Sequence, residues 1–311
     1  MTTPHKKSLA DFRLDKQRVR SAFDQAAADY DAVAVLQREV GQRMLDRLDL
    51  IRINPSRILD AGAGTGYFNA ALSQRYPQSH VVALDLSLSM LEHAHHQSTA
   101  NSPWRWLPYL NNKSSACIFV CGDVEQLPLA ENCIDMIFSN LTLQWCNDMG
   151  RVFEEFRRIL KPGGLFMFST LGPDTLKELR ECWKKIDHFT HVNAFIDMHD
   201  IGDALLRNLF SEPVMDVERF TLTYKEVKTL MHDLKMLGAH NVTAGRRHTL
   251  TGKGRFRALA GLYEKYRHDG VLPASYEVIY GHAWVPEKKQ KSSSPAHEAR
   301  IPLSQLRHRQ G

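Results

Sequence analysis

A glycine-rich loop between an apolar run and a helix-like segment constrains the fold of this chain more than any other feature. Residues 58–61 are a short apolar run, GAGTG follows at 62–66, and the segment 65–76 can form a helix. A second apolar run follows at 80–85. Glycines let the backbone turn sharply after a strand, and a strand, a helix and a strand in this order predict two parallel strands. The loop therefore predicts an α/β fold.

The alternation of apolar runs and helical segments continues to residue 171. Further strands are predicted at 116–123, 133–140 and 165–171, separated by helices at 87–96 and 148–160. Such an alternation is typical of a parallel sheet covered on both faces, wound in two directions by right-handed crossovers. Two later strands, at 215–224 and 276–284, complete a doubly wound, mostly parallel sheet of seven strands.

This pattern divides the chain into five parts. We expect a helical N-terminal cap at 1–50, a ligand-binding core at 51–224, a helical insertion at 225–275, a final core strand at 276–284 and a disordered polar tail at 285–311. A long insertion between two strands is more often functional than a plain connection. The insertion is therefore the candidate substrate lid.

Composition excludes several classes of protein. Hydrophobic residues make up 43% and charged residues 24% of the 311 residues, which is ordinary for a globular chain. No stretch reaches the ~18–20 apolar residues of a membrane span, and no apolar segment of a signal peptide follows the N-terminus. Five cysteines without a CxxC pair favour reduced thiols in the cytoplasm, and they predict no metal site.

The net charge of +5 is unevenly distributed. The segment 225–270 carries ten Lys and Arg against four Asp and Glu, whereas 1–224 has a slight excess of acidic residues. A basic segment on a mildly acidic body suggests an anionic partner, although a solvated surface remains an equal interpretation. The basic residues are not interleaved with aromatics in a nucleic-acid signature, so no nucleic-acid partner is expected.

The glycine loop favours S-adenosyl-L-methionine over a dinucleotide. Its spacing is GxGxG rather than GxGxxG, and Asp60 precedes it, which suits a ligand that has an amino group and no phosphate. Asp85, at the end of the next strand, can accept from ribose hydroxyls, and Asp123 can accept from an adenine amino group. The predicted cofactor-binding residues are Asp60, Gly62, Ala63, Gly64, Gly66, Asp85, Leu86, Asp123, Val124 and Asn140.

Together with the LKPGG turn at 160–164, these motifs resemble the class I methyltransferases over residues 55–171. The flanks resemble a narrower family, the malonyl-acyl-carrier-protein O-methyltransferases of biotin synthesis. The matching segments are FDQAAADYD at 23–31, LQREV at 36–40, SNL at 139–141, STLGPDTL at 169–176, DMHDIGDAL at 197–205, and DLK at 233–235 through GAHN at 238–241. The resemblance covers nearly all of residues 20–284.

The resemblance implies methyl transfer from S-adenosylmethionine to the free carboxylate of a malonyl thioester on acyl carrier protein. The methyl ester would serve as the primer for pimeloyl and biotin synthesis. A carboxylate is already ionised at neutral pH, so we expect no general base, and the histidines are taken as structural or surface residues. Substrate-positioning candidates are Tyr30, Lys235, Arg246 and Arg247. Trp145 is a pocket wall or ordinary core.

Acyl carrier proteins are acidic, so the basic segment 246–267 is the candidate docking site for one. Its cations are Lys253, Arg255, Arg257, Lys265 and Arg267.

Three alternatives remain at this point. One is a methyltransferase acting on another small molecule, with the same cofactor loop and a different acceptor pocket. Another is a methyltransferase-like assembly factor of a respiratory complex, a protein hydroxylase that transfers no methyl group. A nucleic-acid methyltransferase is suggested only by the basic isoelectric point, since residues 139–142 read SNLT and lack an amino-methylating motif.

Overall fold

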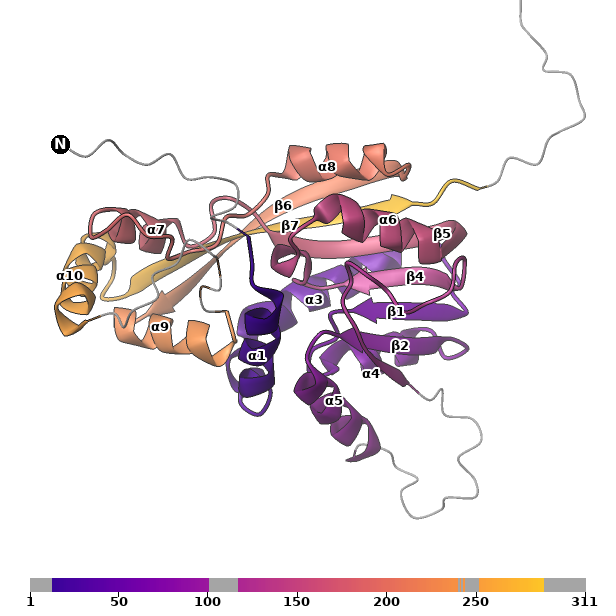
Figure 1. The fold of residues 1–311 in the computed structure, drawn as a ribbon, viewed down its shortest axis with the longest axis horizontal. Coiled ribbons are helices and arrows are strands. Elements are labelled where there is room, and N and C mark those ends of the chain that lie inside the picture. The colour runs from indigo at the N-terminus through magenta and orange to yellow at the C-terminus, as the bar shows by residue number, and fades with distance from the viewer. Residues whose placement is uncertain (1–12, 101–116, 240, 242, 244–251, 288–311) are drawn as a thin grey trace, which may run out of the picture.

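A computed structural model describes residues 13–100, 117–239, 241, 243 and 252–287. A seven-stranded sheet in the order β3-β2-β1-β4-β5-β7-β6 forms its centre (Figure 1). The strands are β1 (Arg57–Ala61), β2 (His80–Asp85), β3 (Ile118–Cys121), β4 (Ile134–Ser139), β5 (Leu160–Leu171), β6 (Ser211–Tyr224) and β7 (Leu272–Trp284). Strands β1 to β5 are parallel, and β7 is antiparallel to both neighbours. The predicted doubly wound sheet is confirmed.

Helices cover both faces of this sheet. They are α1 (Lys16–Ala26), α2 (Tyr30–Val33), α3 (Val35–Arg47), α4 (Tyr67–Arg75), α5 (Leu88–Ala100), α6 (Met149–Ile159), α7 (Lys177–Lys184), α8 (Met198–Arg207), α9 (Val227–Met236) and α10 (Lys253–Tyr263). Short 3-10 turns are η2 (Leu48–Leu50), η3 (Leu143–Trp145) and η4 (Glu264–Tyr266). In α6 a stripe at helical spacing, Val152, Phe153, Phe156 and Ile159, is fully buried. Helices α6 and α8 share one core, and α3, α4, α7, α9 and α10 share the other.

The helical N-terminal segment is not continuous. Asp15 caps the start of α1, since its Oδ1 accepts from the N–H groups of Gln17 and Arg18. Residues 27–29 then form a turn, and α2 and α3 follow as separate helices. The break lets α1 pack against α5 while α2 contacts α9, so the segment bridges the core and the insertion.

Strands β6 and β7 pair along their length, and the insertion connects the end of β6 to the start of β7. Their register runs from Ser211 opposite Trp284 to Tyr224 opposite Leu272. Since β7 begins at Leu272, the insertion ends at residue 271 rather than at 275. Helices α9 and α10 of the insertion gather with α7 at one end of this pair of strands (Figure 1). Within the described ranges, every helix is too short or too polar to cross a membrane.

Candidate active site

A cavity of about 780 Å³ lies where the carboxyl ends of the parallel strands meet the N-terminal segment and the insertion. The strand order reverses between β1 and β4, which is where ligands bind in sheets of this kind. One side of the cavity, here called the cofactor side, is lined by the ends of β1 to β4 and by residues 16–37. The other, the acceptor side, is lined by residues 171–195, β6, α9 and the chain after α9.

The glycine loop adopts a backbone that other residues resist. Gly62, Gly64 and Gly66 all have positive φ, at +83°, +54° and +77°. A Cβ on Gly62 would lie 2.0 Å from the Thr142 Oγ1 and one on Gly66 2.7 Å from the Ala94 Cβ, whereas one on Gly64 would meet no atom within 4 Å. The loop is therefore packed at its ends and open in the middle, where Gly64 faces the cavity.

Two carboxylates lie at the carboxyl ends of β1 and β2, on the cofactor side. The Asp85 Oδ2 accepts from the Gly64 N–H at 2.8 Å and its Oδ1 from the Ser87 N–H at 2.8 Å. Burial raises the pKa of Asp85, and these two hydrogen bonds act against that rise. Asp60 is only 3% exposed, and burial together with the Asp85 charge raises its pKa to about 7. Positive charge in a ligand would relieve both effects.

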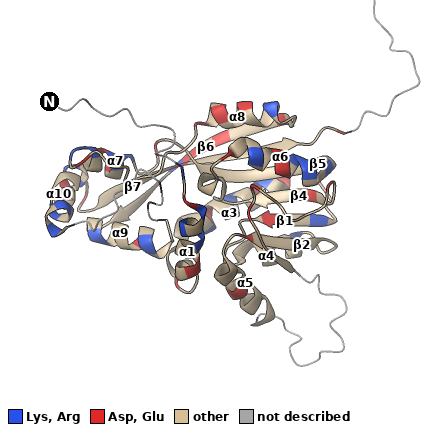
Figure 2. Cartoon of the chain, in the orientation of Figure 1, with Lys and Arg blue, Asp and Glu red and all other residues tan. Residues whose placement is uncertain are grey.

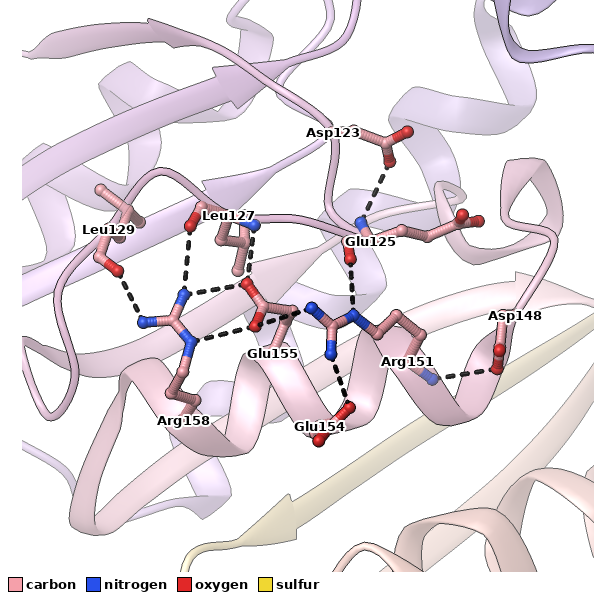
Figure 3. Close-up of polar contacts among 9 residues, drawn as sticks. All are labelled: Asp123, Glu125, Leu127, Leu129, Asp148, Arg151, Glu154, Glu155 and Arg158. Atoms are coloured by element: carbon pink, nitrogen blue, oxygen red, sulfur yellow. Dashed lines mark hydrogen bonds and ion pairs between the residues drawn. The ribbon is translucent and has the colours of Figure 1, made fainter.

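The loop after β3 carries Asp123 and Val124 and is anchored by α6 (Figure 3). The Glu155 carboxylate accepts from the Leu127 N–H at 2.7 Å and from the Arg158 guanidinium at 2.8 and 2.9 Å. Hydrogen bonds from Arg158 lower the pKa of Glu155. Arg158 also donates to the Leu129 and Leu127 carbonyls, so the backbone around Leu127 is held by the buried Glu155 and its partly exposed partner Arg158.

Lys16 forms ion pairs that the sequence patterns did not indicate. Its Nζ lies 3.0 Å from the Asp123 Oδ1 and 3.1 Å from the Glu125 Oε1. The Asp123 Oδ1 also accepts from the Glu125 N–H at 3.0 Å. No described residue donates to the other oxygen of Asp123, which lines the cavity and remains the group that can accept from a base.

The N-terminal segment covers the cofactor side through polar contacts with the core. Asp24 accepts from the Ser87 hydroxyl at 2.6 Å, and Asp31 from the Thr65 hydroxyl at 2.7 Å. Their spacing in the chain places one on α1 and the other on α2, so the turn between these helices is needed for both contacts. The Asn140 Nδ2 donates to the carbonyl of residue 37 at 2.9 Å.

Two aromatic residues complete the cofactor side. Trp145 packs edge-on against Phe23, with ring centroids 5.2 Å apart, and it lines the cavity as a wall. Tyr30 opens α2 and also lines the cavity, where burial and the nearby charges of Asp85 and Asp31 raise its pKa. Its hydroxyl therefore stays neutral at physiological pH and can donate a hydrogen bond.

The acceptor side is mainly apolar. Its lining includes Leu171, Leu176, Leu179, Trp183, Val192, Phe195, Leu222, Met231, Leu234, Leu237 and Ala239. Lys235 lies on α9, exposed, among the lining residues. His191 lines the same side. Arg246 and Arg247 fall outside the described residues.

The predicted cofactor residues fall into two groups. Lining the cavity are Gly62, Gly64, Asp85, Leu86, Asp123, Val124 and Asn140. Asp60, Ala63 and Gly66 are not among the lining residues; Asp60 is buried, and Ala63 and Gly66 are partly exposed in the loop. No sequence motif marked Lys16 or His191 as site residues. The only local signal for His191 is that Asp187 precedes it by four residues.

Comparisons with known proteins match this geometry. A family model described as "Methyltransferase domain" matches residues 59–168. The malonyl-[acyl-carrier protein] O-methyltransferase of Nitrosospira multiformis is 50% identical over 94% of this chain and 96% of its own length. The protein of that name from Laribacter hongkongensis is 54% identical over 90% and 93%.

A solved structure shows the same fold. A putative methyltransferase from Bacillus halodurans has a TM-score of 0.53 and 18% identity, covering 78% of this chain and 97% of its own. The extent and the level of identity to the two curated relatives decide the family. This chain belongs to the malonyl-[acyl-carrier protein] O-methyltransferases.

Proposed function

We propose that this protein transfers the methyl group of S-adenosylmethionine to the free carboxylate of a malonyl thioester carried on acyl carrier protein. The observation that carries the proposal is one cavity that has the glycine loop and the Asp85 carboxylate on one side and a mainly apolar wall on the other. Family membership supplies the acceptor class. The methyl ester would prime pimeloyl and biotin synthesis in the cytoplasm.

The described residues fit S-adenosylmethionine. The open space at Gly64 admits a ligand close to the backbone, the Asp85 carboxylate suits ribose hydroxyls, and Asp123 suits an adenine amino group. Asp60 and Asp85 favour a ligand that carries an amino cation, because burial raises the pKa of both carboxyl groups. The bound cofactor supplies an electrophilic methyl group on a sulfonium.

The chain's own contribution is positioning and exclusion of water. The acceptor carboxylate is ionised at neutral pH and needs no base. Correct alignment of two reactants can contribute roughly 7–11 kcal/mol to lowering a barrier. Tyr30 can donate a hydrogen bond near the reacting groups, while the apolar residues of the acceptor side keep water away from them. Arg246 and Lys235 are the proposed cations for the acceptor.

The carrier protein would dock on α10. Lys253, Arg255 and Arg257 lie on this helix, and no described acidic residue forms an ion pair with any of them (Figure 2). Lys265 and Arg267 instead pair with Glu181 and Glu264, so they are weaker candidates than the sequence suggested. An acidic carrier would be steered to the unpaired cations, and the contact should weaken with salt.

The decisive experiment is methyl transfer from labelled S-adenosylmethionine to malonyl-acyl carrier protein, with malonyl-coenzyme A and acetyl-acyl carrier protein as comparisons. A base-labile methyl ester on the malonyl carrier supports the proposal. Transfer to neither malonyl substrate, with tight cofactor binding in calorimetry, would reject it. Changing Arg246 to Ala should weaken acceptor use far more than cofactor binding, and equal loss of both would remove Arg246 from the proposal.

Docking is tested separately by changing Lys253, Arg255 and Arg257 together to Gln. The KM for malonyl-acyl carrier protein should rise and lose most of its salt dependence, while the KM for malonyl-pantetheine should stay constant. Equal effects on both acceptors would place the three cations elsewhere in the function. The alternatives of another acceptor or of an assembly factor gain no support from the curated relatives, which are named for the carrier-protein reaction.

A further inference from the structure

A histidine on the acceptor side is held in one orientation by two neighbours. The His191 ring lies parallel to the Trp183 ring, with centroids 3.8 Å apart and planes at 5°. The His191 Nε2 lies 2.7 Å from the Asp187 Oδ1. Both rings line the cavity. One face of the imidazole therefore contacts Trp183, and its Nε2 contacts Asp187. The Nδ1 has no hydrogen-bond partner among the described residues.

The Asp187 carboxylate is largely buried and only partly hydrogen bonded. Its side chain is 9% exposed, and its Oδ1 accepts from the Phe189 N–H at 3.1 Å as well as contacting His191. Its Oδ2 is buried and has no partner in the described structure. A buried carboxylate is costly unless a positive charge accompanies it. With Asp187 accepting the Nε2 proton, the Nδ1 nitrogen can also donate only in the charged form of the ring.

Apart from His191, few positively charged side chains among the described lining residues could contact an anionic acceptor. The residues that can carry a positive charge there are Lys16, Lys235 and His191. Lys16 is paired with Asp123 and Glu125 on the cofactor side. Lys235 is exposed, where water weakens its attraction for an anion. His191 is the one among these three that is both sheltered and on the acceptor side.

The other titratable groups on this side come from β6, β7 and α9. They are Tyr224, Tyr276, Asp233 and Lys235. Burial and Asp233 raise the pKa of Tyr224 to about 12, and burial also raises the pKa of Tyr276, so both remain neutral at physiological pH. The Asp233 charge acts on the Tyr224 hydroxyl, and the Asp233 Oδ1 also lies 3.8 Å from the His232 Nδ1.

We propose that His191, charged and held by Asp187 and Trp183, binds the free carboxylate of the acceptor. This inference deepens the proposed function and rests on it for the identity of the acceptor. A malonyl group retains a carboxylate that this ring can bind, whereas an acetyl group has none. Methylation removes the negative charge, so the same contact is lost in the product. His191 would thereby select the acid and release the ester.

Direct binding tests the inference without requiring methyl transfer. Calorimetry would compare malonyl-pantetheine with acetyl-pantetheine on the protein loaded with S-adenosylhomocysteine. A charge-assisted hydrogen bond predicts that His191→Gln weakens malonyl-pantetheine binding about 10- to 100-fold and leaves acetyl-pantetheine unchanged. The control is His199→Gln, because His199 also pairs with an aspartate, Asp197, at 2.8 Å but is exposed on α8. It should change neither affinity.

The variant His191→Arg separates the role of the charge from that of the imidazole ring. An arginine side chain is charged and can form a charge-assisted hydrogen bond with a carboxylate. His191→Arg should therefore keep the preference for malonyl-pantetheine over acetyl-pantetheine that His191→Gln loses. Cofactor binding, measured alongside, shows whether each variant is folded.

Two results would overturn the inference: a His191→Gln protein that keeps its preference for malonyl-pantetheine, or a folded His191→Arg protein that loses this preference. If the preference depends on His191 but no methyl reaches malonyl-acyl carrier protein, the inference stands and the proposed function fails. If methyl transfer occurs and His191→Gln matches the wild type in both binding and KM, only the inference fails.

Discussion

The two sides of the cavity are built by different means. On the cofactor side, backbone N–H groups, hydroxyls and a lysine hold most of the carboxylates, as in the contacts of Asp85 with the N–H groups of Gly64 and Ser87. On the acceptor side, apolar side chains from α7, β6 and α9 make most of the wall, and a single His–Asp pair supplies the sheltered charge. With the ligands proposed above, the first side would recognise the cofactor through its loop backbone and carboxylates, and the second would recognise the acceptor through its shape and the His191 charge.

This difference predicts different effects of mutations on the two sides. A change on the cofactor side alters a tightly packed loop at the end of β1, so it should affect stability and cofactor binding together. A change on the acceptor side alters a wall of side chains, so it should affect the acceptor alone. Four changes probe this contrast, and they are ordered from the largest expected effect.

Changing Gly62 to Ala should disrupt the cofactor side most. The residue has φ of +83°, and its Cβ would lie 2.0 Å from the Thr142 Oγ1. Strain and collision together should lower the free energy of unfolding by about 3–5 kcal/mol and abolish measurable cofactor binding. Urea unfolding and calorimetry would measure both. Gly202→Ala, in α8 with open space around it, should be neutral or slightly stabilising; equal losses in both variants would contradict the role of the loop.

Asp60 should make stability depend on pH. Its pKa is raised to about 7 in the folded protein, so between pH 4 and pH 7 the folded state keeps a proton that the unfolded state has lost. Stability attributable to this group therefore falls as pH rises through that window, by a few kcal/mol at about 1.4 kcal/mol per pKa unit. Asp60→Asn should remove this component from unfolding curves measured at several pH values. Asp203→Asn, on the exposed part of α8, should leave the curve unchanged.

Glu155→Gln should loosen the Asp123 loop. The change removes the charge that Arg158 and the Leu127 N–H contact, and it should cost about 1–3 kcal/mol of stability. Because hydrogen bonds from Arg158 lower the pKa of Glu155, the wild-type contribution is present above the unfolded pKa and is lost as pH falls through the folded pKa. Cofactor affinity should fall modestly. Glu154→Gln, which removes only an exposed partner of Arg151, is the matched control; a similar loss there would argue against the anchor.

Met231→Ala should produce the smallest effect and touch only the acceptor side. Met231 lies on α9, is partly buried and lines the cavity. Its truncation should raise the KM for the malonyl acceptor about threefold, at roughly 1 kcal/mol or less of lost contact, and leave cofactor affinity unchanged. Steady-state kinetics and calorimetry would separate the two. A parallel loss of cofactor affinity would show that the two sides are not independent.

The sequence predicted the parallel core well because the signals there are local. The strand at 80–85 has the predicted bounds, and the glycine loop follows β1 as expected. The carboxyl ends of parallel strands must meet at one edge, so Asp85, Asp123 and Asn140 could be placed near one another without a structure.

The sequence predicted the flanks less well because their contacts are distant in the chain. Lys16 and Asp123 are separated by 107 positions, and no periodicity brings them together. The break after α1 depends on two aspartates that bind the core, which an apolar stripe does not reveal. The β6–β7 hairpin exceeds its predicted length because ladder hydrogen bonds extend it beyond the apolar alternation.

The pairing of Tyr224 with Leu272 has a consequence for how such an enzyme can change over evolutionary time. The chain leaves and rejoins the sheet at the same residue pair, so the insertion is a single loop whose two ends are held together by the strands. Lengthening such a loop adds little entropic cost, about 0.6 kcal/mol per doubling. Insertion and core can therefore diverge at different rates, so the part of the acceptor side that α9 supplies can change while the cofactor side stays the same.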